Sequence, residues 1–399
     1  MASIDNKIYV NSPFKVVHTS TDLTKAVLNI WIYSGVQGDA QVAGTDAPPS
    51  NGRTEDSLAY TLTSTAVGLN NEEYVAFEIS SLIRGFLKEK FDGNSNDSRF
   101  TSTIFVDYQL TTFLGSNDTI QALVRCAAYD GYTYFEEGFN AQAACNGLLS
   151  ADVISKLEDT PIEIGVDVNE TSRVSFLKDG DLINSKAIST NNTGSTQLEY
   201  VSGTYDNADR YELRVLNDGG IFEGSTCLTA FKCTEELFEC DTIYVENTSG
   251  DIRVIKVNTL ERTQHTPYKV TFVNKDGAFE HIWFVGNSTE SLSVKSKNHN
   301  RVTTDYAGGG SYSISDAPRY RQRLSSNKEI TLNSGFHPEG SNSSFEEMMQ
   351  SNDVWIEYNN LILPILLKSS TFNIKTHLND DAINYTVRAE FAFNRINNL

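Results

Sequence analysis

The stretch Tyr385–Phe393 reads YTVRAEFAF, and apolar and polar side chains alternate almost perfectly along it. Alternation with a period of two places the two sets of side chains on opposite faces of a β-strand. The pattern is typical of a strand that pairs inside a sheet, because a slip of one residue would turn its apolar set towards solvent. This closing stretch therefore predicts a β-sheet.

Strand pairs joined by turn signals occur in the residues before it. Arg173–Lys178 and Leu182–Ala187 flank Asp-Gly-Asp, and Lys269–Val273 and Phe279–Val285 flank Asn-Lys-Asp-Gly. Short turns that contain Asp-Gly or Asn and Gly predict β-hairpins. Aromatic residues make up 11% of the chain, which also favours strands over helices. The predicted fold class is mainly β, with two to three β-sandwich or barrel-like domains and a few short helices.

The division into domains follows from length and from the spacing of turns. A chain of 399 residues is too long for one ordinary core. We predict an N-terminal β-domain over residues 1–160, a middle β-domain over 161–265 and a C-terminal β-domain over 266–399. The C-terminal domain is expected to carry a long polar loop over residues 286–325.

Three stretches have helical patterns. In the first domain, the apolar residues of SSLIRGFLKEKF fall on one helical face and predict an amphipathic helix over residues 81–91. A short helix is expected at Ser150–Glu158, where Ser150 would be the cap. Ser344–Gln350 predicts one or two further helical turns. Gln37–Asp56 is rich in Gly, Pro and Asp, and is expected to be an exposed loop.

The charge of the chain limits its partners. The formal net charge is -20, so a nucleic acid or an anionic membrane would be repelled, and neither is an expected partner. The start MASIDNKIYV lacks the basic and apolar parts of a secretory signal. No stretch approaches the roughly 20 apolar residues of a membrane helix. We expect synthesis in a cytoplasm.

No sequence pattern for catalysis, a cofactor or a metal is convincing. The phosphate-binding glycine motifs, H-E-x-x-H and G-x-S-x-G are all missing. Asp92, Asn94 and Asn96 have the spacing of a calcium loop, but Asp97 and Thr103 stand where Gly and Glu are needed. Adjacent acids do not supply the facing geometry of a glycosidase. The chain is therefore expected not to be an enzyme and to hold no cofactor.

An aromatic segment, YDGYTYFEEGFN, occupies residues 129–140. Tyr129, Tyr132, Tyr134 and Phe139 are candidates for an exposed platform on which a sugar or a protein partner stacks. The alternative is a hairpin whose aromatic side chains complete the core, and we favour it for this segment.

A basic cluster, RYRQR, stands out in this acidic chain. Arg319, Arg321 and Arg323 would share one face of a strand. They are candidates for a contact with an acidic patch on a neighbouring subunit. A solvated loop explains the same residues equally well.

Several stretches resemble tail structural proteins of bacteriophages that infect Bacteroidota-type hosts. The first and third regions carry them: AVLNIWIYSG, YTLTS, YVAFEISSLIRGFL and AAYDGYTYFEEGFN, then YKVTFVNKDGAFEHIWF, VWIEYNNLILPILLKSSTFNIK and YTVRAEFAF. The ending is similar to the C-terminal β-domain of tail-tip and baseplate ring proteins, including distal tail proteins. The resemblance implies a homo-oligomeric ring or sleeve without catalytic residues.

The expected function is that of a virion structural protein, a subunit of a ring or sleeve in a phage tail or baseplate. Its expected partners are copies of itself and other virion proteins, and its expected location is the virion tail. The alternative is a receptor- or glycan-binding adhesin module of the tail tip, which would hold a host glycan. A depolymerase is a third possibility, but it would need a solenoid repeat or facing carboxylates, and the sequence shows neither.

Overall fold

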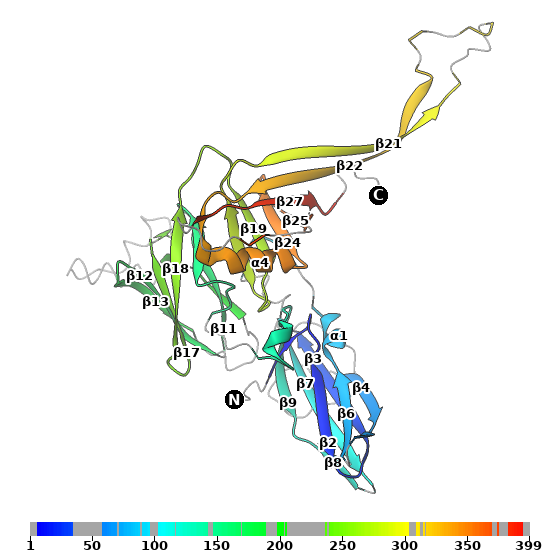
Figure 1. Cartoon of the computed structure of the whole chain (residues 1–399), viewed down its shortest axis with the longest axis vertical. Helices are drawn as coiled ribbons and strands as arrows, with labels where there is room; N and C mark the ends of the chain where they lie inside the picture. The colour runs from blue at the N-terminus through cyan, green and yellow to red at the C-terminus, as the bar shows by residue number, and fades with distance from the viewer. Residues whose placement is uncertain are drawn as a thin grey trace, which may run out of the picture.

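The computed structural model of the chain confirms a mainly β fold with several sheets and short helices (Figure 1). The strands form three groups, which follow one another over residues 6–129, 153–260 and 268–391. The structure describes residues 6–34, 58–69, 72–87, 90–95, 103–115, 117–142, 147–168, 170–188, 198–202, 204–205, 236–237, 239–302, 309–311, 314–315, 317–368, 373–374 and 382–393. The predicted loop at Gln37–Asp56 lies outside them.

The first group is a pair of sheets that share one apolar core. Leu28 and Val106 from the larger sheet and Val75 and Phe77 from the smaller sheet are all buried in it. The larger sheet has the order β1–β9–β7–β3–β4 with β8 beside β7, and the smaller has the order β2–β6–β5. The bounds are β1 Asn6–Tyr9, β2 Lys15–Ser20, β3 Leu23–Ser34, β4 Leu58–Thr65, β5 Val67–Leu69, β6 Glu72–Glu78, β7 Thr103–Leu114, β8 Asn117–Ile120 and β9 Val124–Tyr129.

The helix expected over residues 81–91 is shorter in the structure. The helix α1 covers Ser80–Arg84, and Gly85 stands at its C-cap, where glycine ends helices readily. Its apolar face exists as expected, because Ile83 and Leu87 are buried in the core of the first group. The length was therefore wrong, while the amphipathic pattern was right.

The middle group contains a five-stranded sheet, β10–β18–β17–β12–β13, and two strand pairs, β11–β14 and β15–β16. The hairpin predicted around Asp-Gly-Asp is present, and Asp179 and Gly180 have the positive φ angles that its tight turn needs. The bounds are β10 Val153–Leu157, β11 Glu163–Asp167, β12 Thr171–Lys178, β13 Asp181–Ala187, β14 Leu198–Ser202, β15 Thr204–Tyr205, β16 Glu236–Leu237, β17 Thr242–Asn247 and β18 Ile252–Leu260.

The helix expected at Ser150–Glu158 is wrong, because these residues supply the strand β10. It runs parallel to β18, from Val153 beside Lys256 to Leu157 beside Leu260. A sheet edge that needs a partner overrides a weak helical pattern, and β-branched residues such as Val153 suit a strand. The pairing also joins these residues to the middle sheet, although the first predicted domain runs to residue 160.

The third group is a seven-stranded sheet, β20–β19–β24–β25–β27–β22–β21, with α4 packed on it (Figure 1). It also contains a separate strand pair, β23–β26. YTVRAEFAF lies inside this sheet as expected, because β27 pairs with β25 on one side and β22 on the other. The bounds are β19 Tyr268–Val273, β20 Phe279–Phe284, β21 Thr289–Asn300, β22 Arg319–Asn333, β23 His337–Pro338, α4 Asn342–Gln350, β24 Val354–Tyr358, β25 Leu361–Leu367, β26 Ala382–Ile383 and β27 Thr386–Phe391; the 3-10 turns are η1 Phe135–Glu137 and η2 Glu339–Ser341.

The polar loop expected over residues 286–325 is also wrong in part. Residues 289–300 and 319–325 of it belong to a long hairpin of β21 and β22, with Thr289 paired to Thr331 and Asn300 paired to Arg319. Every residue of β21 is exposed. A strand with both faces in water needs no apolar face, and alternation here is limited to Leu292 and Val294, so the pattern that reveals other strands is weak.

An aromatic cluster joins the three groups. Phe91, which follows α1, has its ring centroid 5.2 Å from Phe279 of β20 and 5.9 Å from Trp355 of β24. Tyr200 of β14 completes the contact, 6.1 Å from Phe279. These buried rings come from all three parts of the chain, so the groups share apolar surface with one another.

Candidate functional site

The turn between β19 and β20, residues 274–278, is the place where the three groups meet, and we call it the hub. Its first residue, Asn274, is 1% exposed. The Oδ1 atom of Asn274 accepts hydrogen bonds from the backbone N–H groups of Asp276 at 3.1 Å and Ala278 at 3.0 Å. Its Nδ2 atom donates to the carbonyl oxygen of Leu148 at 3.0 Å and to Oε2 of Glu280 at 3.1 Å. One side chain therefore shapes the hub and holds the connector at residues 147–151 against it.

The first group touches the hub through its backbone. The N–H of Tyr132 donates to the carbonyl oxygen of Lys275 at 2.8 Å. Gly277 has a φ of +79°, and a Cβ atom there would lie 2.9 Å from the Cβ of Tyr129. Only glycine suits this position, because it needs both a left-handed backbone and the smallest side chain.

A buried ion pair ties the first group to the middle group. The Nζ atom of Lys7, on β1, lies 2.8 Å from Glu170 and 3.3 Å from Asp167. The hydroxyl of Tyr129 donates to Asp167 at 2.7 Å, and Tyr129 is 1% exposed. Tyr129 is thus part of an internal junction, and its place in an exposed aromatic platform was wrong.

His281, on β20, lies in a second polar junction. Its Nε2 atom is 3.0 Å from Oε2 of Glu163 on β11, and its Nδ1 atom is 2.9 Å from Oγ1 of Thr271 on β19. Burial lowers the pKa of His281, so the ring is neutral at pH 7. A neutral ring donates from Nε2 to the carboxylate and accepts at Nδ1 from the threonine hydroxyl.

In many enzymes, a carboxylate, an imidazole and a hydroxyl in a row form a catalytic triad. In this row, however, Thr271 is 3% exposed and is paired with His281 across two neighbouring strands. Ser95, whose hydroxyl donates to Glu163 at 3.0 Å, is 2% exposed. Because both hydroxyls are covered, we interpret the row as a structural tie between the groups.

The aromatic segment is ordered but is not one continuous platform. The rings of Tyr132 and Tyr134 meet edge to face at 5.6 Å, and the Tyr132 hydroxyl donates to Gln350 of α4 at 3.1 Å. Phe139 is 67% exposed, and its neighbour Phe135 is 100% exposed. Sequence reasoning missed Phe135, although a phenylalanine beside two glutamates in a turn is the signal of such exposure.

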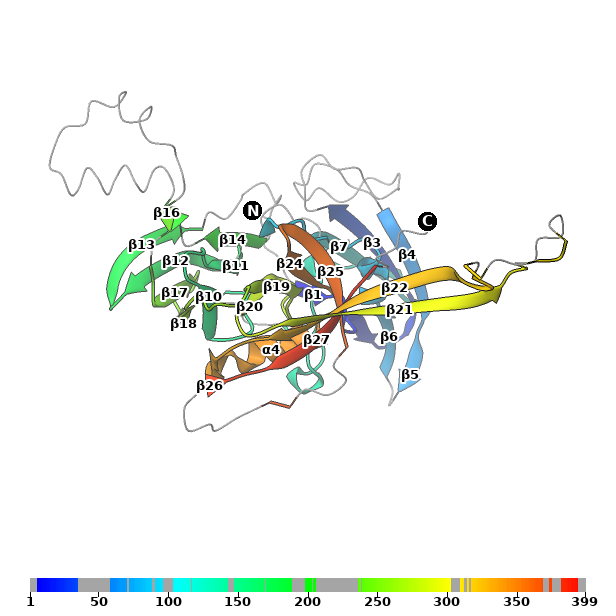
Figure 2. The same ribbon diagram turned by 90° about the horizontal axis from the view of Figure 1, so that it is seen from above.

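The hairpin of β21 and β22 projects from the body as an arm (Figures 1 and 2). The strand β27 pairs with β22 only over Glu329–Asn333. Nearer the tip, β22 has β21 as its partner, and no described strand pairs with the outer edge of β21. An isolated two-stranded ribbon is marginally stable in water, so an arm of this kind gains stability by packing on another surface.

The root of the arm is fixed to the body. The Nζ atom of Lys328 lies 2.7 Å from Glu290 and 4.4 Å from the centre of the Tyr358 ring. Lys368 bridges Glu329 at 2.7 Å and Glu390 at 2.6 Å. These contacts join β21, β22, β24, β27 and the residue that follows β25, so they hold the root of the arm against the sheet.

The predicted arginine cluster lies on this arm. Arg319 and Arg321 are exposed on β22, opposite Asn300 and Asn298 of β21. The register of the hairpin is irregular between Gln322 and Ser325, and Arg323 lies within this interval. The side chain of Arg323 itself lies outside the described residues.

The arm has the opposite charge to the rest of the chain. Residues 295–323 hold six Lys and Arg against two Asp. Since the whole chain has 32 Lys and Arg and 52 Asp and Glu, the remainder holds 26 basic and 50 acidic side chains. The arm therefore carries positive charge outwards from an acidic body.

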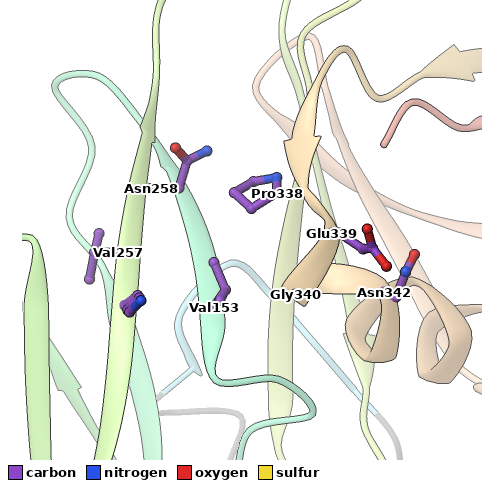
Figure 3. A pocket seen from close by; sticks show the side chains of 8 residues that line it. Val153, Val257, Asn258, Pro338, Glu339, Gly340 and Asn342 are labelled. Carbon is purple, nitrogen blue, oxygen red and sulfur yellow. The ribbon is translucent and has the colours of Figure 1, made fainter. Parts of the chain in front are cut away.

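An open hollow of about 670 Å³ lies between the middle group and the third group. Figure 3 shows Val153 and Asn258 facing Pro338, with Glu339 and Asn342 close together beyond it. Among the described residues that line it, Lys256 and Glu339 are the charged ones. A specific small-molecule site usually has several polar groups that converge in an enclosed space, and this hollow lacks that arrangement.

Within the described ranges, no three or more His, Cys, Asp or Glu side chains are placed to hold a metal ion. No helix in the part of the chain that the structure describes is long and apolar enough to span a bilayer. Comparison with protein-family models gives no match, and comparison with curated proteins gives none either.

Proposed function

We propose that this protein is a structural subunit of an assembled virion, a component of a ring or sleeve in a phage tail or baseplate. The observation that carries the proposal is the basic arm, which projects from an acidic body whose three strand groups are joined at the hub. The stretches that resemble tail proteins add support, because YKVTFVNKDGAFEHIWF forms the hub and its two strands. Such a role requires contacts between chains and no reaction.

In this proposal, the arm of one copy lies on the acidic body of the next copy. Opposite charges steer the two surfaces together and disfavour the pairing of arm with arm. A contact between two different patches is heterologous, and it closes into a ring if the rotation between copies allows. The unpaired edge of β21 offers backbone hydrogen bonds in addition, since exposed strand edges readily accept a further strand.

Charge reversal on the arm tests the proposal. We expect Arg319→Glu, Arg321→Glu and Arg323→Glu, made together, to weaken self-association at least tenfold, because three attractive contacts become repulsive. Sedimentation velocity over a range of concentrations measures the change. The loss should be larger at low salt than at high salt, since exposed charges are screened.

The matched control reverses three exposed arginines on the body, Arg84, Arg173 and Arg262. This variant has the same net charge as the arm variant but leaves the arm intact. We expect it to associate more strongly than the arm variant does. Equal association by the two variants would remove the arm from the proposal.

A glycan- or receptor-binding module is a second candidate, and the exposed aromatic rings favour it. Phe135 and Phe139 stand in solvent on a segment that hydrogen bonds hold in place, for example from Thr133 N–H to the Ser12 hydroxyl at 2.8 Å. Ordered, exposed aromatic rings are common in contact surfaces. A glycan array tests this candidate, and binding that Phe135→Ala abolishes would favour it over assembly alone.

A further inference from the structure

Ser150, in the connector at residues 147–151, is hydrogen-bonded to two buried glutamates from distant parts of the third group. Its Oγ atom lies 2.7 Å from Oε2 of Glu280 on β20 and 2.7 Å from Oε2 of Glu347 on α4. Glu280 is 4% exposed and Glu347 is 7% exposed. One hydroxyl thus links the connector, the sheet and the helix.

The two contacts of Ser150 Oγ with Glu280 and Glu347, which we call the joint, need one proton more than the serine hydroxyl supplies. A serine hydroxyl has one hydrogen to donate, and an ionised carboxylate can only accept. If both glutamates were ionised, one of the two short oxygen–oxygen contacts would have no hydrogen in it. Both contacts become hydrogen bonds when one carboxyl is protonated and donates to Ser150.

The surrounding donors indicate which glutamate holds the proton. Oε2 of Glu280 receives hydrogen bonds from the Ser150 N–H at 2.9 Å and from Nδ2 of Asn274 at 3.1 Å, in addition to the Ser150 hydroxyl. Oε2 of Glu347 receives one backbone bond, from Lys275 at 2.8 Å. Several donors stabilise an ionised carboxylate, so Glu280 carries the charge and Glu347 the proton.

The charges that face Glu347 also favour its protonated form. Burial and the negative charge of Glu280 raise the pKa of Glu347 to about 7, and Asp276 of the hub adds to the effect. The segment before η1 contributes the neutral hydroxyls of Tyr132 and Tyr134, whose pKa values are raised by burial and by Glu347.

The cation whose charge reaches Glu347, Lys275, is already shared with another carboxylate. Lys275, the nearest cation of the hub, pairs with Glu137 at 2.5 Å. His337 packs on Phe345 of α4, and burial lowers its pKa, so it is neutral at pH 7. On α4 itself, Glu346 is acidic as well.

We propose that a single proton, held between Glu347, Ser150 and Glu280, closes the joint between the connector, β20 and α4, and that its loss loosens this joint. A loosened joint would let the first and middle groups shift against the third sheet and its arm. The inference does not depend on the proposed function, because it rests on hydrogen bonds within one chain.

The sign of the pH dependence follows from linkage. The pKa of Glu347 is raised on folding, from 4.5 to about 7. Its contribution to stability is therefore complete below pH 4.5, falls as the pH rises from 4.5 to 7, and is lost above pH 7. Between pH 4.5 and 7, the protection of the Ser150 and Lys275 amides against hydrogen exchange should fall by up to about tenfold per pH unit, after correction for intrinsic exchange, and it should level off above pH 7.

Glu347→Gln is the direct test, because the amide is neutral at every pH and can donate to Ser150. We expect its amide protection to be independent of pH between 4.5 and 7, the range in which that of wild type falls. Glu346→Gln is the matched control on the same helix and should behave like wild type. The same fall in protection in Glu347→Gln and in wild type would overturn the proposal.

Infrared titration of the wild-type protein gives a second measurement that does not rely on a variant. A protonated carboxyl absorbs at a frequency distinct from that of a carboxylate. We expect one carboxyl band to disappear near pH 7. If all carboxyl bands disappear below pH 5.5, the proposal is wrong whether or not the variants fold.

Discussion

Asn274→Ala should destabilise the protein by roughly 3 to 5 kcal/mol, because several buried groups lose their hydrogen-bond partners at once. The substitution removes the donor to the Leu148 carbonyl oxygen and the acceptor for the Asp276 and Ala278 N–H groups. Glu280 loses one of its donors as well. Chemical denaturation followed by tryptophan fluorescence measures the loss.

The chain contains a matched control for this prediction in the turn between β17 and β18. Oδ1 of Asn247 accepts from the N–H groups of Ser249 at 2.9 Å and Asp251 at 2.8 Å, with Gly250 at a φ of +89°. The turn has the same form as the hub, but its tip is in water. Asn247→Ala should therefore cost about 1 kcal/mol. Equal losses in the two variants would show that the hub is an ordinary turn.

Gly131→Ala should be at least as damaging, by about 3 kcal/mol or more, because the new atom has no space. A Cβ at Gly131 would lie 2.3 Å from the carbonyl oxygen of Lys275, 2.7 Å from the Tyr9 ring and 3.0 Å from the Gly277 nitrogen. Two of these three neighbours are backbone atoms of the hub, which cannot rotate away. The clash would push the first group off the hub and break the bond from Tyr132 N–H to Lys275.

Gly68→Ala is the control for Gly131→Ala. Gly68 lies on β5, and no atom stands within 4 Å of the position that its Cβ would take. We expect its stability to stay within about 0.5 kcal/mol of wild type. Thermal unfolding of the two variants gives the comparison. If Gly131→Ala unfolds at the same temperature as Gly68→Ala, the close contact between the first group and the hub does not exist in solution.

Local patterns in the sequence predicted the elements whose cause is local. YTVRAEFAF became β27 because its alternating faces fit between two strands, and Asp179-Gly180 formed the predicted turn. The predictions of secondary structure were wrong where contacts with distant residues determine the structure. Val153–Leu157 became a strand because β18 offers it an edge, and β18 lies about a hundred residues away.

The candidate sites also differ in whether their cause is local in the sequence or depends on distant residues. The sequence indicated the arginine cluster, because charge is visible in composition, but it did not show that the cluster lies on a projecting arm. Nothing local relates Ser150 to Glu280 and Glu347, which are 130 and 197 residues away. Likewise, the interpretation favoured for the aromatic segment had its side chains in the core, as Tyr129 is, but nothing local indicates its partner Asp167, which is 38 residues away.

Cross-linking between differently labelled copies tests the central claim most directly. Chains labelled with ¹⁴N and ¹⁵N are mixed, and a reagent that joins amines to carboxylates without a spacer is added. We expect mixed-label cross-links from Lys295 and Lys297 of the arm to Asp or Glu residues on the body of another copy, in products that are multiples of 44.3 kDa. A single product of 44.3 kDa at every protein concentration, with no mixed-label pair from the arm, would contradict the account.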